Sequence, residues 1–258
     1  MFKKEQTVAV WLLWSVFWIT PQLKAEELNM KTNEVKPQYS IQRAAQVPSG
    51  FGCWSDPAWV GAQTLEVSNF REKSSEHRPP TQARVLYDDQ YLYVQFRVMD
   101  HYVRAVAEKY QDMVCKDSCV EFFVQPKPGK GYFNFEVNAG GCMLLYFIPC
   151  SPEGNAIMAE NQPVPAELVR DMNIYHSLPA RIDPEIQEPC EWTIEYRIPL
   201  ALFEHYLGPI GSLSGQTWAA NFYKCADATS HPHWGAWAPV PEGSFHQPAK
   251  FGELIFKP

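Results

Sequence analysis

Residues 83–99 read ARVLYDDQYLYVQFRVM, two runs of β-forming residues separated by the turn-forming segment 88–90. Two such runs around a short polar turn predict a β-hairpin. Apolar residues occupy every second position from Leu92 to Val98, and the positions between them are polar or aromatic. An alternation with period two is typical of a strand that is buried on one face. The hairpin therefore predicts an antiparallel sheet packed on a core.

The same pattern recurs along the chain, with Pro-rich and Gly-containing connections between the runs. No internal repeat and no linker divides these segments. Successive short strands with turn signals between them predict an all-β protein, a β-sandwich of jelly-roll or immunoglobulin-like two-sheet architecture with long loops and one or two short helices. The further predicted strands are 119–125, 132–138, 142–148, 192–198, 218–225 and 252–256, and a short helix is predicted at 199–206.

Residues 1–25 have the features of a cleaved export signal. Lys3 and Lys4 precede an uncharged apolar run that ends before Pro21, and Ala25 provides a small residue for cleavage. The run is shorter than the about 20 residues of a membrane-spanning helix, so a cleaved signal is favoured over an uncleaved anchor. We therefore predict a secreted or periplasmic protein without stable membrane insertion. The predicted parts are a signal peptide (1–25), a polar leader (26–48) and a binding domain (49–258).

The composition limits the classes of partner. The 258 residues carry a net charge of −7, so there is no basic surface of the kind that binds nucleic acid. Nine Trp, twelve Tyr and fifteen Phe offer many flat apolar faces. The seven cysteines are odd in number and include no C-x-x-C pair, so we expect mostly free thiols with one or two disulfides.

Acidic and amide side chains share one face of two neighbouring predicted strands. Glu121 and Glu136 lie at outward positions, and Asn134 and Asn138, which are poor strand formers, share the face of Glu136. Planar polar side chains of these kinds bind sugar hydroxyls, and flat aromatic rings cover the C–H surfaces of sugars. The face is therefore a candidate ligand site, with Lys224 as a balancing cation. The alternative is an ordinary solvated sheet face.

The segment 221–251 supplies the candidate rings. Phe245 is apolar in a polar, Gly-flanked loop, so we predict that it is a stacking platform. Aromatic residues over a sandwich commonly cap the core instead, and this alternative applies to Trp234 and Trp237. His231 and His233 resemble a metal-ligand pair, but two ordinary loop histidines are the favoured interpretation. The candidate ligand-binding residues of this segment are Tyr223, Lys224, Trp237, Phe245 and His246.

Five segments, in order, resemble carbohydrate-binding module family 9 in the broad sense that includes domains of exported bacterial proteins. The resemblance covers roughly residues 49–257. It implies a β-sandwich with long loops and a non-catalytic module that clamps terminal sugars between two Trp rings, often beside structural calcium. The segments are 83–94 (ARVLYDDQYLYV), 117–123 (DSCVEFF), 132–138 (YFNFEVN), 191–199 (EWTIEYRIP) and 245–254 (FHQPAKFGEL).

The resemblance carries over to individual positions. Glu121 falls where the family has a ligand-binding Glu, and Phe245 falls where it has one stacking Trp. The second Trp falls at about Cys115, which cannot stack, and a ligand-binding Arg falls at about Glu136, which reverses the charge. The chain resembles a variant branch with Asn-Phe-Glu and Asn-Phe-Tyr-Lys-Cys patterns.

We therefore predict an exported protein that binds a glycan in a sheet-face cleft and supports carbohydrate catabolism. No catalytic residue is assigned, and structural calcium is the only cofactor that the resemblance implies. One alternative is a glycoside hydrolase, which needs two carboxylates about 5–5.5 Å or about 6.5–9.5 Å apart; Glu121 and Glu136 are the candidates. Another is a haem-binding redox sandwich with axial ligands from His101, Met113 and His231.

Overall fold

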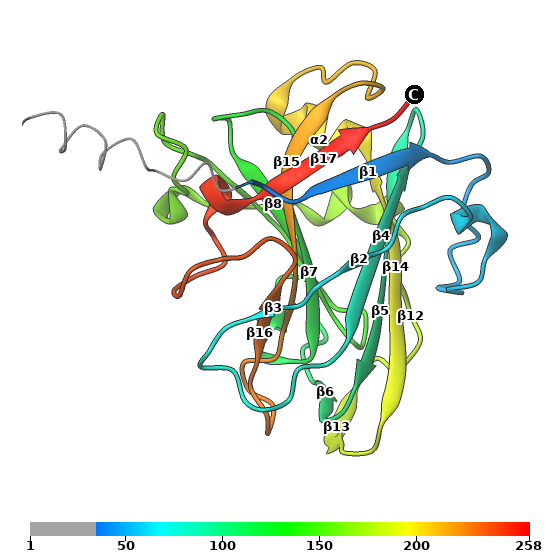
Figure 1. Ribbon diagram of the computed structural model, residues 1–258, viewed down its shortest axis with the longest axis vertical. Coiled ribbons are helices and arrows are strands. Elements are labelled where there is room, and N and C mark those ends of the chain that lie inside the picture. Colours follow the sequence, from blue (N-terminus) through cyan, green and yellow to red (C-terminus); the bar gives the residue numbers. More distant parts are fainter. Residues whose placement is uncertain (1–34) are drawn as a thin grey trace, which may run out of the picture. The chain divides into compact units, whose positions relative to one another are not determined.

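Two layers of β-sheet enclose the main hydrophobic core. The computed structural model describes residues 35–258, of which residues 36–258 form one compact unit (Figure 1). The predicted signal peptide and residues 26–34 of the predicted leader lie outside the described residues. Within the described part of the chain, no helix is long and apolar enough to cross a membrane.

The first sheet has the strand order β11-β10-β8-β7-β15-β17-β1. Its neighbouring strands are antiparallel, except that β17 and β1 are parallel. Small strands extend it: β9 pairs with β8, β16 with β15, and β3 with β16. The bounds are β1 (Gln38–Arg43), β3 (Asn69–Phe70), β7 (Cys119–Gln125), β8 (Tyr132–Asn138), β9 (Met143–Leu144), β10 (Tyr146–Ile148), β11 (Gln162–Pro163), β15 (Thr217–Cys225), β16 (Trp234–Ala236) and β17 (Gly252–Phe256).

The second sheet has the order β1-β4-β5-β14-β12, with β2 beside β4, and β6 and β13 form a separate pair. Strand β1 joins the two sheets because its first residues pair with β17 and its last two pair with β4. The bounds are β2 (Leu65–Glu66), β4 (Thr81–Tyr87), β5 (Tyr91–Asp100), β6 (Val103–Ala105), β12 (Tyr175–His176), β13 (Ile182–Ile186) and β14 (Cys190–Pro199).

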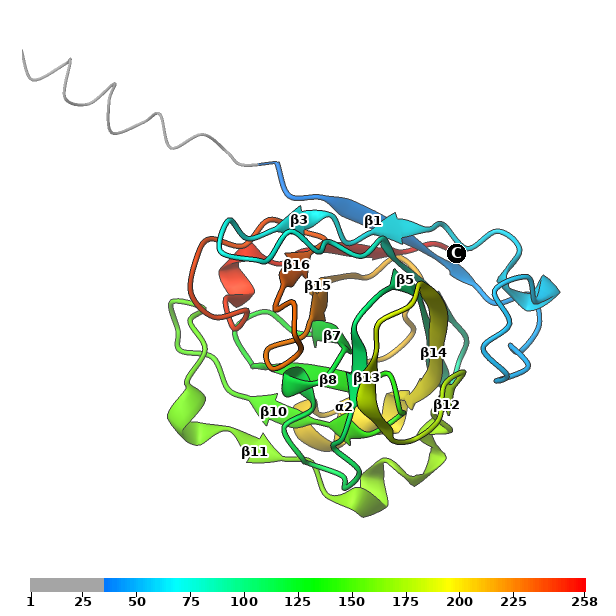
Figure 2. The same cartoon turned by 90° about the horizontal axis from the view of Figure 1, so that it is seen from below.

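The core lies between the two sheets. Figure 2 shows β15, β7 and β8 on one side and β5 and β14 on the other. The alternating apolar residues of these strands fill the space, and each fully buried large side chain contributes about 1.5–3 kcal/mol. Helix α2 (Leu200–Leu207) closes the core through Phe203, whose ring packs on Phe133, Phe135 and Trp218. The remaining elements are the 3-10 turns η1 (Pro57–Trp59), η2 (Val114–Lys116), η3 (Met158–Glu160), η4 (Ala166–Leu168), η5 (Arg170–Met172) and η6 (Pro248–Lys250).

The prediction of an all-β sandwich with long loops is confirmed. Two details are corrected. Part of the predicted leader is β1, where Tyr39 and Ile41 are buried in the core, so the domain begins before residue 49. Such a short alternation within a polar segment gives little periodic signal. The strand predicted at 142–148 is interrupted and forms β9 and β10.

Candidate functional site

A cavity of about 460 Å³ opens on the outer face of the first sheet. Strands β7, β8 and β15 form its floor. Its walls come from segments far apart in the sequence: the end of β3, the turn η2, the region of η3, strand β16 and the loop 243–246. A cavity of about 300–1,000 Å³ with a few convergent polar groups is the usual form of a small-molecule site.

The outer sheet face is not solvated, although its strands alternate as the sequence predicts. A second apolar cluster covers it, with Phe123 and Tyr132 from the strands and Phe251 from the chain after the loop. Because the connections of the molecule fold over this face, Glu121 is only 3% exposed and Glu136 only 6%. The predicted outward positions therefore face a buried cavity rather than water.

Glu121 and Glu136 are directly opposite each other on β7 and β8. Cys225 Sγ donates a hydrogen bond to Glu121 Oε1 at 2.9 Å, and Asn134 Nδ2 donates to Glu136 Oε1 at 2.8 Å. Asn134 Oδ1 in turn accepts from the backbone N–H of Tyr146 at 2.7 Å, which fixes the orientation of the amide. The predicted group of Glu121, Asn134 and Glu136 does meet at one place, the cavity floor.

Burial of the two carboxyl groups changes their ionisation. It raises the pKa of Glu121 to about 7. Burial and the adjacent Glu121 charge raise the pKa of Glu136 well above its usual range. Two neighbouring carboxylates resist ionising together, so the pair shares a proton near neutral pH. The protonated carboxyl group of the pair then donates a hydrogen bond through its O–H, and the other carboxylate oxygens accept.

Arg71 is the cation of the cavity, and the sequence analysis did not single it out. It follows β3, and its backbone N–H donates to Trp234 O at 2.9 Å. The residue is 8% exposed, and within residues 35–258 its Nε and Nη2 atoms have no hydrogen-bond partner. Burial lowers the pKa of Arg71, yet a guanidinium stays protonated at neutral pH. Its place at the start of a polar, Pro-containing connection gave no sign that it is buried.

Phe245 lines the cavity, but both faces of its ring are covered. The Tyr223 ring stacks on it with centroids 4.1 Å apart and an interplanar angle of 17°. The Arg71 guanidinium lies 4.2 Å from the same centroid and, because Tyr223 occupies one face, covers the other. The predicted free stacking platform is therefore not available in this arrangement. Tyr223 is fully buried beneath Phe245 and does not line the cavity.

Trp234 is the half-buried ring at the cavity rim. Its Nε1 donates to Asp227 Oδ1 at 2.7 Å, and Lys73 Nζ lies 5.3 Å from its ring centroid. All three residues line the cavity. The sequence analysis assigned Trp234 to the core as an alternative, because residue type alone does not distinguish a core ring from a rim ring.

His246 lines the cavity from the loop that carries Phe245. Its Nδ1 lies 2.7 Å from the Tyr132 hydroxyl, and burial lowers the pKa of His246 to about 4. A neutral imidazole that accepts from Tyr132 at Nδ1 presents an N–H at its other nitrogen. His246 thus adds a neutral polar group rather than a charge.

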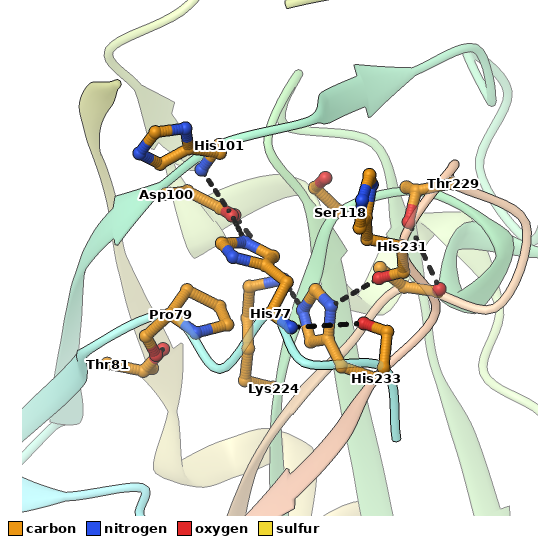
Figure 3. A network of polar contacts seen from close by, with 12 residues as sticks. His77, Pro79, Thr81, Asp100, His101, Ser118, Lys224, Thr229, His231 and His233 are labelled. Atoms are coloured by element: carbon orange, nitrogen blue, oxygen red, sulfur yellow. Dashed lines mark hydrogen bonds and ion pairs between the residues drawn. The ribbon is translucent and has the colours of Figure 1, made fainter. Parts of the chain in front are cut away.

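Lys224 is on the opposite face of β15, so its predicted role beside the glutamates is wrong. It pairs with the core residue Val120, whereas its neighbour Tyr223 pairs with Glu121. Lys224 Nζ lies 3.5 Å from Asp100 Oδ2 and donates to His233 Nε2 at 2.8 Å (Figure 3).

The surroundings of Lys224 form a closed network. Asp100 also contacts His77 at 2.7 Å and accepts from Trp192 Nε1 at 3.1 Å. Burial opposes ionisation of Asp100, but Lys224 and His77 hold the pKa of this carboxyl well below its usual range. Burial and the nearby Lys224 charge lower the pKa of His233 to about 3, so its ring is neutral. We name Lys224, Asp100, His77 and His233 the lysine network.

Asn138 and Trp237 are also absent from the cavity, and both have structural contacts. Asn138 is fully buried: its Nδ2 donates to Asp117 Oδ2 at 2.9 Å, and its Oδ1 accepts from the backbone N–H of Cys142 at 2.8 Å. Trp237 packs on the core residue Phe222, with ring centroids 5.8 Å apart. Trp237 therefore caps the core, as the alternative interpretation held.

Metal-ligating side chains gather at one place among the described residues. Cys119, Glu121 and Cys225 have ligand atoms within 4.8 Å of one another. Two thiols and one carboxylate do not match the all-oxygen donor set of calcium. All seven cysteines are unpaired thiols in the structure. The cluster therefore does not support the calcium site that the resemblance implied.

The histidines do not form the sites that were considered from the sequence. His233 uses both ring nitrogens, since its Nδ1 contacts His231 O at 2.9 Å and its Nε2 accepts from Lys224. A metal-binding His231–His233 pair therefore does not fit. For the haem alternative, His101 and His231 both lie beside His77, whereas Met113 lines the cavity.

Comparison with known proteins places the chain in a family. The model of carbohydrate-binding family 9 matches residues 55–256. The chain belongs to carbohydrate-binding family 9. The predicted family is thereby confirmed. No curated protein matches the chain significantly.

Three solved structures have the same fold. A candidate carbohydrate-binding protein from Bacteroides uniformis ATCC 8492 is 28% identical, with a TM-score of 0.74; the match covers 86% of this chain and all of that one. Two structures of a family 9 module from Caldicellulosiruptor kristjanssonii also match. The complex with cellotriose is 13% identical, with a TM-score of 0.58 and coverage of 86% and 94%. The complex with glucose is 14% identical, with a TM-score of 0.55 and coverage of 86% and 96%.

Proposed function

We propose that this family 9 protein binds a carbohydrate in the cavity over β7 and β8. The observation that carries the proposal is the cavity floor, where Glu121, Glu136 and Asn134 converge beneath Arg71. Sugar hydroxyls both donate and accept hydrogen bonds, and this set of side chains offers both kinds of partner. Trp234 at the rim supplies a flat face for the C–H surface of a sugar ring.

Glucose and short β-linked gluco-oligosaccharides are the first ligands to test, because the related modules were solved with glucose and cellotriose. We expect modest affinity, since one ring and a few charge-assisted hydrogen bonds are available. Binding free energies on the order of −4 to −8 kcal/mol correspond to millimolar to micromolar dissociation constants. The protein would act by binding, and not by cleaving, the glycan.

The test is a glycan array followed by calorimetry on the purified protein. Binding should be lost or weakened at least tenfold in Glu121→Gln and in Arg71→Met, which keep side-chain volume but remove a carboxylate or the guanidinium donors. Glu188→Gln and Arg170→Met are the matched controls, because both residues are exposed and outside the cavity. Array signals at background for every glycan, or equal binding by both cavity variants, would refute the proposal.

The same samples test the hydrolase alternative. Incubation with the bound oligosaccharides should release no shorter sugar. Turnover that both Glu121→Gln and Glu136→Gln abolish would replace the binding function with a catalytic one, since hydrolysis needs a carboxylate pair.

Export and a role in carbohydrate catabolism belong to the same proposal. The positively charged start, the apolar run and Ala25 support a cleaved signal. An exported binding protein would hold a glycan for uptake or for degradation by other proteins. Mass spectrometry of the protein from its native host should find an N-terminus near residue 26; an intact Met1 in the extracellular or periplasmic fraction would contradict cleavage.

A further inference from the structure

The cavity floor holds two buried carboxyl groups that form no ion pair in the described part of the chain. Within the described part of the chain, neither Glu121 nor Glu136 forms an ion pair, and each accepts one hydrogen bond, from Cys225 and Asn134 respectively. Lys224, the buried ammonium of the floor strand β15, points to the other face and contacts Asp100. Buried carboxylates without a counter-charge are costly. Arg71 is the cation of the cavity and favours the charged form of Glu121, but it forms no ion pair with Glu121 or Glu136. Among the described residues, therefore, no positive group contacts the carboxyl pair directly, and a ligand can provide one.

The geometry of the pair suits one small cation. Residues directly opposite on antiparallel strands have Cβ atoms about 4.5–5.5 Å apart, so the two carboxyl groups can reach a single atom between them. An ammonium group has three N–H donors and no acceptor. It can donate to both carboxylates at once, whereas a hydroxyl has only one proton to donate.

Arg71 gives a second, independent indication of a ligand. Arg71 lines the cavity, more than nine-tenths of the residue is buried, and its Nε and Nη2 atoms have no hydrogen-bond partner in residues 35–258. A buried donor left without an acceptor costs about 1–3 kcal/mol, and more when it is charged. The ligand that completes the cavity therefore carries an acceptor oxygen as well as a cation.

We propose that the sugar selected by this cavity is an amino sugar with a free ammonium group, a hexosamine, held between Glu121 and Glu136 while one of its oxygens accepts from Arg71. This inference rests on the proposed function and names the class of sugar that the same cavity takes. A neutral hexose brings no positive group into contact with the two carboxyl groups. A uronic acid would bring a third carboxylate to them.

Matched ligands test the inference by calorimetry at pH 7. The methyl glycoside of glucosamine should bind at least tenfold more tightly than methyl glucoside, methyl N-acetylglucosaminide and methyl glucuronide. The glucosaminide, the N-acetylglucosaminide and the glucoside differ only at C2, so their affinity ratios report the ammonium, and the glucuronide differs from the glucoside only at C6, so that ratio reports an added carboxylate. Nα-acetyl-lysine amide, whose side-chain amine is free, supplies an ammonium without a sugar and should not bind measurably.

Variants assign the effect to the floor. In Glu136→Gln the preference for the amine over methyl glucoside should fall at least fivefold, because the amide removes one negative charge and keeps the shape. Glu188→Gln, which removes an exposed carboxylate outside the cavity, should keep the full preference.

The outcomes separate this inference from the proposed function. Equal or tighter binding of the neutral or acidic glycoside refutes the amino-sugar inference and leaves carbohydrate binding intact. Binding of none of the glycosides, when other glycans also fail on the array, refutes both. Equal binding of Nα-acetyl-lysine amide shows an amine site rather than a sugar site. Loss of glucosaminide binding on adding a chelator shows that a metal, through the cluster of Cys119, Glu121 and Cys225, holds the ligand; both results also overturn the inference.

Discussion

Two buried polar clusters lie on opposite faces of β15. They differ in how many of their charges and hydrogen-bonding atoms find a partner within the protein. In the lysine network, Lys224 and Asp100 neutralise each other, and His77 and His233 complete the hydrogen bonds. In the cavity, Glu121 and Glu136 each accept a hydrogen bond but form no ion pair in the described chain, and Arg71 has two donor atoms without a partner there. Buried polar groups are normally satisfied. A satisfied cluster is expected to stabilise the fold, and an incomplete one beside a cavity is expected to bind a ligand.

Among the proposed variants, removal of the ammonium from the lysine network should have the largest effect on the free energy of unfolding. Lys224→Met leaves Asp100 buried without its ammonium partner, which should lower the free energy of unfolding by about 3–5 kcal/mol. The melting temperature should fall by roughly 6–20 °C in a domain of this size. Calorimetric or circular-dichroism melting measures this shift. Lys130→Met, at an exposed position, is the control.

A second variant keeps this test informative. In Lys224→Met/Asp100→Asn the buried charge is absent, so part of the lost stability should return. A cost below about 1 kcal/mol for Lys224→Met would mean that the lysine network is not what stabilises this side of the sheet.

Removal of a charge from the cavity should do the reverse and stabilise the protein. Burial raises the pKa of both glutamates. Above about pH 4.5 the unfolded chain has lost these protons, whereas the folded protein still holds them. The free energy of unfolding therefore falls as the pH rises from about 4.5 through about 7, where Glu121 loses its proton in the folded protein. Glu136→Gln removes one of these groups while its amide can donate to Glu121. We expect a gain of about 1–3 kcal/mol at pH 8.

Melting curves from pH 5 to pH 8 measure this gain. It should shrink toward pH 5, where the wild-type pair is protonated. Arg71 and Asp227 also line the cavity and are unchanged in the variant. The control Glu188→Gln should change the melting temperature only slightly, and by the same amount at every pH. A variant less stable than the wild type at pH 8 would show that the glutamate pair stabilises the fold.

The rim ring should affect affinity rather than stability. Trp234→Ala removes the half-buried face at the cavity and should weaken sugar binding by about 1–2 kcal/mol, which is five- to thirtyfold. Trp54→Ala is the control, because this half-buried ring lies beside Arg84 and outside the cavity. Calorimetry with the best array ligand measures both. Equal losses in the two variants would contradict a stacking role for Trp234.

Phe245 should show the smallest effect on binding. Its ring faces are occupied by Tyr223 and Arg71, so Phe245→Leu should change the affinity by no more than about threefold, or about 0.7 kcal/mol. The lost packing should instead lower the melting temperature. A tenfold loss of affinity without destabilisation would restore Phe245 as the stacking platform.

Much of the fold follows from local patterns. The predicted bounds of β7, β8 and β17 agree with the structure, because each has several alternating apolar residues and ends at polar or turn-forming ones. The same alternation placed Glu121 and Glu136 on one face of neighbouring strands. Strand β1 escaped prediction because it is held by pairing with β17 and β4, distant segments that give no local signal.

The candidate site could be predicted only in part, since burial depends on which loops cover the sheet. Arg71 lies in a segment that has the composition of an exposed connection, yet the loop with Phe245 buries it. Lys224 is one residue from Tyr223, and only the strand register shows that it faces the other side. Phe245 has the expected loop position, but its neighbours occupy both ring faces.

By itself, the sequence determined most of the longer strands, their inward and outward faces and the family, because period-two alternation and short ordered motifs are local properties. Tertiary structure alone decided that distant segments form a cavity on the outer face, that Arg71 belongs to it and that Lys224 does not. The physical reason is that solvation of a charge depends on the side chains brought around it by folding, and these come from distant parts of the chain.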